Sequence, residues 1–69
     1  MIDAGTIEYL GYSIAVTELA GRFTPRVSRA GGVIEHDGRV SEIWAAASCG
    51  SMDRAFAVAK SAIDTGRIK

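Results

Sequence analysis

The spacing of the apolar residues changes near residue 50, and this change constrains the fold more than any other feature. Before it, short segments of alternating apolar and polar residues are separated by glycine, proline or Asp-Gly signals, a pattern typical of β-strands. After it, apolar residues recur at intervals of three and four, as in an amphipathic helix, at Met52, Ala55, Phe56, Ala59, Ala62 and Ile63. The order predicts an α+β fold: an antiparallel β-meander of three to four strands with one C-terminal helix packed on one face (β-β-β-β-α).

We expect the strands at about residues 6–17, 22–29, 32–36 and 39–46 of a single domain that spans residues 1–69. In the first strand, Gly11 is predicted to mark a bulge, which explains why Tyr9 falls out of phase with the apolar residues that follow. In the second strand, Pro25 has no N–H to donate, so we place it at a sheet edge or in a bulge.

The turn at His36-Asp37-Gly38 has two possible geometries. A two-residue turn would pair His36 with Arg39 and would place Val40 opposite Glu35. A three-residue loop with Gly38 in the left-handed conformation would instead pair Ile34 with Val40. We favour the loop, because it collects the apolar residues Ile34, Val40 and Trp44 on one face.

The helix is expected from about residue 51 to residue 65. Ser51 is predicted to be its N-cap, with the hydroxyl accepting a hydrogen bond from the N–H of Asp53 or Arg54. Gly66 is predicted to be its C-terminal cap. Ser51, Gly66 and Gly38 are therefore assigned structural roles.

The composition excludes several classes of protein. With 69 residues and a single cysteine, the chain forms no internal disulfide, and one histidine with one cysteine cannot complete a four-ligand zinc site. A stability of about 3–5 kcal/mol must therefore come from packing, aided by any self-association.

Eight basic and eight acidic residues cancel, so any electrostatic recognition must be local. No stretch approaches the ~18 apolar residues of a membrane span, and we expect a cytoplasmic protein without a cofactor.

Cys49 is the one candidate nucleophile, because it precedes the helix and the helix dipole lowers the pKa of a nearby thiol. A thiol enzyme also needs a base, and His36, the only histidine, is expected at the tip of a hairpin. The neighbouring triplet Glu35-His36-Asp37 has poor geometry for chelating a metal. We therefore expect no catalytic, cofactor-binding or metal-binding residue, and we keep a small thiol enzyme using Cys49 as an alternative.

One helix covers only one face of a sheet, so the other face must meet water or a partner. Strand alternation and the basic segment "RFTPRVSR" give the candidate partner-binding residues, and an out-of-phase tyrosine is added to them: Arg22, Thr24, Arg26, Ser28, Arg29, Tyr9 and Ile43. We predict a non-enzymatic interaction domain that binds another protein or itself through this open face. The alternative is a nucleic-acid-binding or antitoxin-like module that uses Arg22, Arg26 and Arg29.

Three stretches carry a resemblance to a family: "YLGYSIAV" at 9–16, "GRFTPRVSR" at 21–29 and "SMDRAFAVAKSAID" at 51–64. Together they resemble small uncharacterised bacterial domains with a Tyr-x-Gly-Tyr strand and an alanine-rich helix. These are similar to HicB-type antitoxins, which have a partial double-stranded-RNA-binding-like fold. The resemblance implies the fold and no activity. HicB-type proteins usually carry a separate DNA-binding segment, for which this chain has no residues left.

Overall fold

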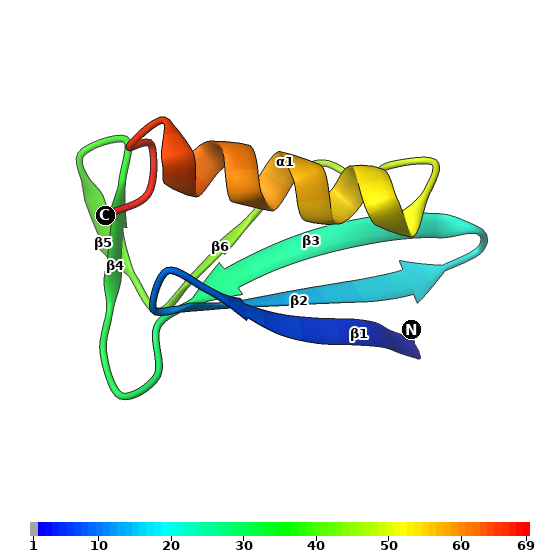
Figure 1. Cartoon of the computed structure of the whole chain (residues 1–69), viewed down its shortest axis with the longest axis horizontal. Coiled ribbons are helices and arrows are strands. Elements are labelled where there is room, and N and C mark those ends of the chain that lie inside the picture. The colour runs from blue at the N-terminus through cyan, green and yellow to red at the C-terminus, as the bar shows by residue number, and fades with distance from the viewer. Residues whose placement is uncertain (1) are drawn as a thin grey trace.

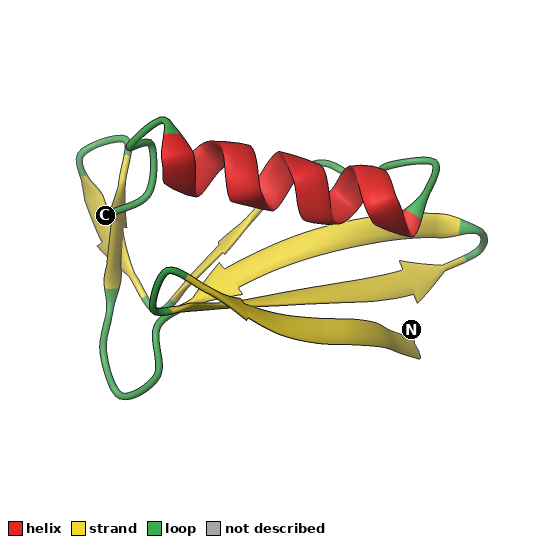
Figure 2. Cartoon of the chain, in the orientation of Figure 1, coloured by secondary structure: helices red, strands yellow, loops and turns green. Residues whose placement is uncertain are grey.

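The computed structural model describes residues 2–69 and contains a four-stranded antiparallel sheet in the order β1-β2-β3-β6 (Figure 1). The strands of this sheet are β1 (Ile2–Tyr9), β2 (Tyr12–Leu19), β3 (Arg22–Ser28) and β6 (Ile43–Ala45). A separate antiparallel hairpin contains β4 (Ile34–His36) and β5 (Arg39–Ser41), and the helix α1 spans Met52–Asp64 (Figure 2). The predicted α+β class, with an antiparallel sheet and one C-terminal helix, is confirmed.

The segment predicted as one strand over residues 6–17 is a hairpin instead. Leu10 and Gly11 both have positive φ, 51° and 85°, as in the two-residue turns that match the twist of paired strands. Tyr9 and Tyr12 face each other across this turn. The bulge predicted at Gly11 is therefore wrong, and the register irregularity of β1 lies between residues 3 and 5. The hairpin explains the shift in apolar phase, because it places residues 7 and 14 opposite each other.

Pro25 lies in β3, an inner strand, and not at an edge as predicted. Phe23 exchanges both backbone hydrogen bonds with Cys49, so the backbone groups of residues 23, 25 and 27 point away from β2. The carbonyl of Pro25 accepts from the N–H of Ala46, just after β6 ends. The missing N–H of Pro25 therefore falls where the outer ladder is already interrupted, between β6 and Cys49.

The hairpin of β4 and β5 has a two-residue turn, so the predicted three-residue loop is wrong. His36 pairs with Arg39 and Glu35 with Val40, and Asp37 and Gly38 have φ of 51° and 73°. The left-handed conformation predicted for Gly38 is present, but as the second residue of this tighter turn. Val40 is 65% exposed, so the apolar phase that favoured the longer loop does not apply.

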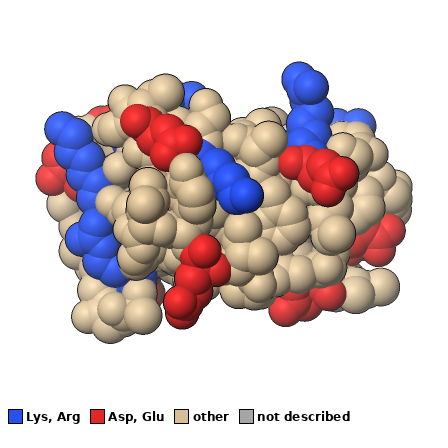
Figure 3. Space-filling view, viewed as in Figure 1, with Lys and Arg blue, Asp and Glu red and all other residues tan. Residues whose placement is uncertain are grey.

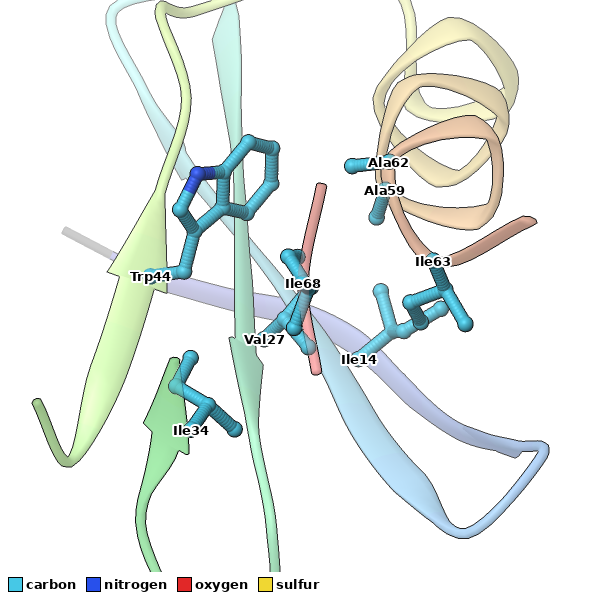
Figure 4. Packing of buried hydrophobic residues seen from close by; sticks show 8 residues of the cluster. All are labelled: Ile14, Val27, Ile34, Trp44, Ala59, Ala62, Ile63 and Ile68. Atoms are coloured by element: carbon cyan, nitrogen blue, oxygen red, sulfur yellow. The ribbon is translucent and has the colours of Figure 1, made fainter. Parts of the chain in front are cut away.

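The core lies between α1 and one face of the sheet, and it extends to the hairpin of β4 and β5 (Figure 4). Buried alanines on the inner side of α1 allow this close packing. The methyl groups of Ala59 and Ala62 point toward the core in Figure 4. The buried cluster contains Ile14, Val27, Ile34, Trp44, Ala59, Ala62, Ile63 and Ile68. The C-terminal segment closes the core, since Lys69 and Glu35 exchange backbone hydrogen bonds of 2.8 and 2.9 Å and bring Ile68 beside β4.

Both predicted helix caps are present. The Ser51 hydroxyl accepts a hydrogen bond of 3.2 Å from the N–H of Arg54, one of the two donors expected. At the other end Gly66 has a φ of 77°, which glycine adopts without strain. The Gly66 N–H donates to the carbonyl of Ile63 and the Arg67 N–H to that of Ala62, the two bonds of a Schellman motif.

Replacing Ser51 by alanine is expected to lower the free energy of unfolding by about 1 kcal/mol, because the Arg54 N–H loses its acceptor. Ser51→Asp is the matched control, since aspartate caps equally well and should stay within about 0.5 kcal/mol of the unmodified protein. Urea denaturation followed by circular dichroism measures both. Equal losses in the two variants would contradict the capping role of the hydroxyl.

Candidate interaction surface

The face of the sheet opposite α1 carries no helix or strand among residues 2–69, and we call it the open face (Figure 1). Its residues follow from alternation along each strand. Ile14, Val16 and Val27 are fully buried beneath the helix, so their neighbours in sequence point the other way. The open face is made of Asp3, Thr6, Glu8, Ser13, Ala15, Thr17, Leu19, Arg22, Thr24, Arg26, Ser28, Ile43 and Ala45.

The centre of the open face combines small side chains with one arginine, because Ala15 faces Arg26 between two rows of hydroxyl residues. Across β2 and β3, Ser13 faces Ser28 and Thr17 faces Thr24, so short hydroxyl side chains form most of the middle rows. Two exposed aliphatic side chains lie near opposite ends of these rows. Leu19 at the end of β2 is 62% exposed, and Ile43 of β6 is 46% exposed. The open face therefore places hydroxyl groups and Arg26 between two apolar positions.

Five of the predicted partner-binding residues belong to this face: Arg22, Thr24, Arg26, Ser28 and Ile43. Arg22 starts on the same face, but its guanidinium holds the loop that leads into α1. Its Nε donates to the Ser48 hydroxyl at 3.2 Å, and its Nη2 donates to the Ser48 carbonyl at 3.0 Å. Arg22 therefore positions this loop, a role that the local sequence pattern did not indicate.

Arg29 belongs to the opposite side of the sheet, so it does not share the open face with Arg22 and Arg26, with which the nucleic-acid alternative grouped it. Its Nη2 donates to the Tyr12 hydroxyl at 2.8 Å, and its guanidinium carbon lies 4.8 Å from the centre of the Tyr12 ring. Tyr12 has the same orientation as the buried Ile14 two residues later. The basic segment is therefore divided between the two faces, because Arg29 and Arg26 have opposite phases along the chain.

Tyr9 does not supply the exposed contact that was predicted. Its hydroxyl donates to the Asp64 carboxylate, at 2.7 Å to Oδ1 and 3.0 Å to Oδ2, and Lys60 Nζ lies 5.5 Å from its ring centre. The hydrogen bond to Asp64 is the main reason why the pKa of the Tyr9 phenol lies above its ordinary value. Tyr9 thus attaches the C-terminal half of α1 to the first hairpin.

Cys49 and His36 lie near opposite ends of α1. Cys49 pairs with Phe23 just before the helix begins, whereas His36 pairs with Ile68 after the helix ends. A helix of 13 residues spans about 20 Å. The structure therefore does not bring together the pair that a thiol enzyme would need. Within residues 2–69, no group of three or more His, Cys, Asp or Glu side chains has the geometry to hold a metal ion.

A shallow pocket of about 240 Å³ lies between the tip of the β4–β5 hairpin and the C-terminal segment. Its charged lining mixes both signs: Glu35 and Asp37 against Arg67 and Lys69. His36 Nε2 is 3.0 Å from the Ser41 hydroxyl, which itself donates to the carbonyl of Ile43. The mixed charges favour no single ligand class, and acidic and basic side chains are also interspersed on the surface in Figure 3.

Comparison of the chain with protein-family models, with curated proteins and with solved structures found no match in any of the three. The resemblance to HicB-type proteins therefore stays a prediction. In the described part of the chain, no helix is both long enough and apolar enough to cross a membrane.

Proposed function

We propose that this chain is a non-enzymatic interaction domain that binds the surface of another protein through the open face. The observation that carries the proposal is the coverage of the sheet by a single helix. The opposite face is left with a hydroxyl-rich centre around Ala15 and Arg26, and with Leu19 and Ile43 exposed at 62% and 46%. Apolar side chains at such positions, surrounded by hydroxyl groups able to donate and accept, suit a protein surface of similar chemistry.

A nucleic acid fits this face less well than a protein does. Single-stranded nucleic acids are bound by basic grooves with exposed aromatic rings on which bases stack. Among residues 2–69, the aromatic side chains belong to the helix side of the sheet or to α1 itself. Of the three arginines in the basic segment, Arg22 is engaged with Ser48 and Arg29 with Tyr12. Glu8 adds a negative charge to the open face.

A photo-crosslinking amino acid placed at residue 15 tests the proposal in cells that naturally make the chain. We expect the Ala15 position, at the centre of the open face, to capture one recurrent protein. The same amino acid at the exposed helix position Ala57 serves as the matched control and should not capture that protein. Adding Ile43→Arg to the Ala15 version should reduce the capture at least about tenfold, because a charge replaces an exposed apolar contact.

Three outcomes would contradict the proposal: no capture at Ala15, equal capture of one protein at Ala15 and Ala57, or capture of nucleic acid alone. Capture of a second copy of the chain at Ala15 would instead show that the open face serves self-association.

A further inference from the structure

The outer edge of β1 is the longest exposed strand edge of the sheet. β1 stands at one end of the strand order and spans eight residues, whereas β6 at the other end spans three. Edge strands offer unpaired N–H and C=O groups to any further strand, and proteins commonly protect such edges with lysine or proline. The sequence of β1, IDAGTIEY, has neither, and its protection is limited to two carboxylates, Asp3 and Glu8, and to an irregularity near its start. Its one irregularity lies at residues 3–5, so the stretch from Gly5 to Tyr9 pairs regularly with β2.

The turn geometry shows which backbone groups of β1 point outward. In a two-residue turn over Leu10 and Gly11, Tyr9 and Tyr12 form a hydrogen-bonded pair. Alternation then directs the backbone groups of Ile7 toward β2 and those of Thr6 and Glu8 toward the free edge. The second hairpin obeys the same rule. Arg22 pairs with Leu19 across the turn, and the next residue, Phe23, directs its N–H and C=O away from β2, where both bond Cys49.

Apolar side chains lie along the same edge on the helix side. The helix packs mainly on β2 and β3, so β1 is only partly covered. Phe56 Cζ and Met52 Sδ lie 3.5 and 3.9 Å from the point where a Cβ on Gly5 would be, which places both side chains over β1. Ile7 and Phe56 are half-buried, and Met52 is 38% exposed. A strand added to β1 would cover both the free backbone groups and these side chains.

We propose that β1 pairs antiparallel with β1 of a second copy of this chain, about a two-fold axis at Ile7. The pairing joins two four-stranded sheets into one continuous sheet, with both helices on one side and both open faces on the other. The backbone edge of β1 lies at the border of the open face, to which the Thr6 and Glu8 side chains belong, and strand pairing there is a different contact from docking on that face, so this inference goes beyond the proposed function.

The chemistry of β1 selects the register. An axis at Glu8 would place two carboxylates directly opposite each other, which is destabilising. An axis at Thr6 would place Glu8 opposite residue 4, inside the irregular part of β1. With the axis at Ile7, Thr6 faces Glu8 of the second copy on both sides of the axis. The outward N–H and C=O groups of Thr6 then exchange hydrogen bonds with those of Glu8 in the second copy. Each Thr6 hydroxyl also has the Glu8 carboxylate as an acceptor, and the two Ile7 side chains meet on the helix side.

The mass of the unmodified protein, measured by sedimentation at concentrations up to about 1 mM, should rise from 7.3 kDa toward twice that value. Thr6→Pro removes an outward N–H and should weaken dimerisation at least about tenfold. Thr6→Val keeps the N–H and the shape of the side chain, so it is the matched control and should dimerise within about threefold of the unmodified protein. A monomer at every concentration would overturn the proposal, as would undiminished dimerisation of a Thr6→Pro variant with a native circular dichroism spectrum.

A disulfide experiment tests the register and needs no proline. In a Cys49→Ser background, Thr6→Cys protein is mixed with Glu8→Cys protein under mild oxidation; both positions are exposed, so both variants should fold. The proposed register places these two cysteines directly opposite each other, about 5.5 Å apart at Cα. Identical positions are separated by more than the ~7 Å that a disulfide can bridge. A predominant mixed disulfide is expected by mass spectrometry, and either no disulfide or mainly Thr6→Cys homodimers would refute the register.

The two interfaces fail independently. Ile43→Arg alters the open face and should leave the β1 dimer intact, because Ile43 lies on β6, at the opposite end of the strand order from β1. Loss of the dimer in Ile43→Arg, with the fold preserved, would overturn the assignment of the dimer to β1.

Discussion

Replacing Ala59 by glutamate is expected to unfold the chain at neutral pH. Ala59 is fully buried between α1 and the sheet, within the cluster that contains Ile14 and Val27. A glutamate at this position would place an unpaired charge in an apolar contact and would also force the helix away from the sheet. Leaving an ionised group unpaired in the interior costs several kcal/mol, about 3–5, which is comparable with the whole stability expected of a domain of this size.

Ala57→Glu is the control for this variant. It makes the same chemical change in the same helix, with the same effect on helix propensity, but at an exposed position. Its free energy of unfolding should stay within about 0.5 kcal/mol of the unmodified protein. Far-UV circular dichroism and urea denaturation separate the two variants. A folded Ala59→Glu variant with an unchanged urea midpoint would mean that α1 does not pack on the sheet through Ala59.

The helix was predictable because two independent signals agree over its whole length. The apolar period of three and four continues from residue 52 to residue 63, and cap residues stand at both ends. The helix observed at Met52–Asp64 differs from the predicted span of about 51–65 only by its capping residues. Local propensity and the global fold agree in this segment, so no tertiary contact is needed to explain it.

The turns were harder to predict, because the deciding information is not local. Leu10 in the first turn is not a typical turn residue, and the flanking β-branched and aromatic residues read as one continuous strand. At Asp37-Gly38 the dipeptide itself indicated the two-residue turn. The longer loop follows only from placing Val40 on one face with Ile34 and Trp44, and the structure leaves Val40 exposed. Turn chemistry was the better guide here than apolar phase.

The open face was partly predictable, because side chains alternate between the two faces of a sheet along each strand. Alternation along β3 correctly placed Thr24, Arg26 and Ser28 on one side. What alternation cannot give is the direction that a long side chain takes at the end of a strand. Tyr9 bonds Asp64, 55 residues away, and Arg22 bonds Ser48, 26 residues away. Such contacts depend on where α1 and its leading loop come to lie, which no local pattern specifies.

The C-terminal segment shows the same limit in the core. After Gly66 the sequence continues with a basic, an apolar and a second basic residue, which gives no periodic signal. In the structure this segment runs beside β4, where Ile68 is 2% exposed and completes the core near Ile34 and Trp44 (Figure 4). The sequence does not indicate that Ile68 is buried, because Ile68 is buried only by its position beside β4.

Replacing Ile68 by alanine is therefore expected to lower the free energy of unfolding by about 2–5 kcal/mol, most of the stability expected here, because it leaves a cavity beside Ile34 and Trp44. Ile43→Ala is the matched control, since the same atoms are removed from a side chain that is 46% exposed, and its loss should stay below about 1 kcal/mol. Urea denaturation followed by Trp44 fluorescence and circular dichroism measures both. Losses of similar size in the two variants would show that Ile68 does not belong to the core, and the backbone pairing of Lys69 with Glu35 would then have to form without it.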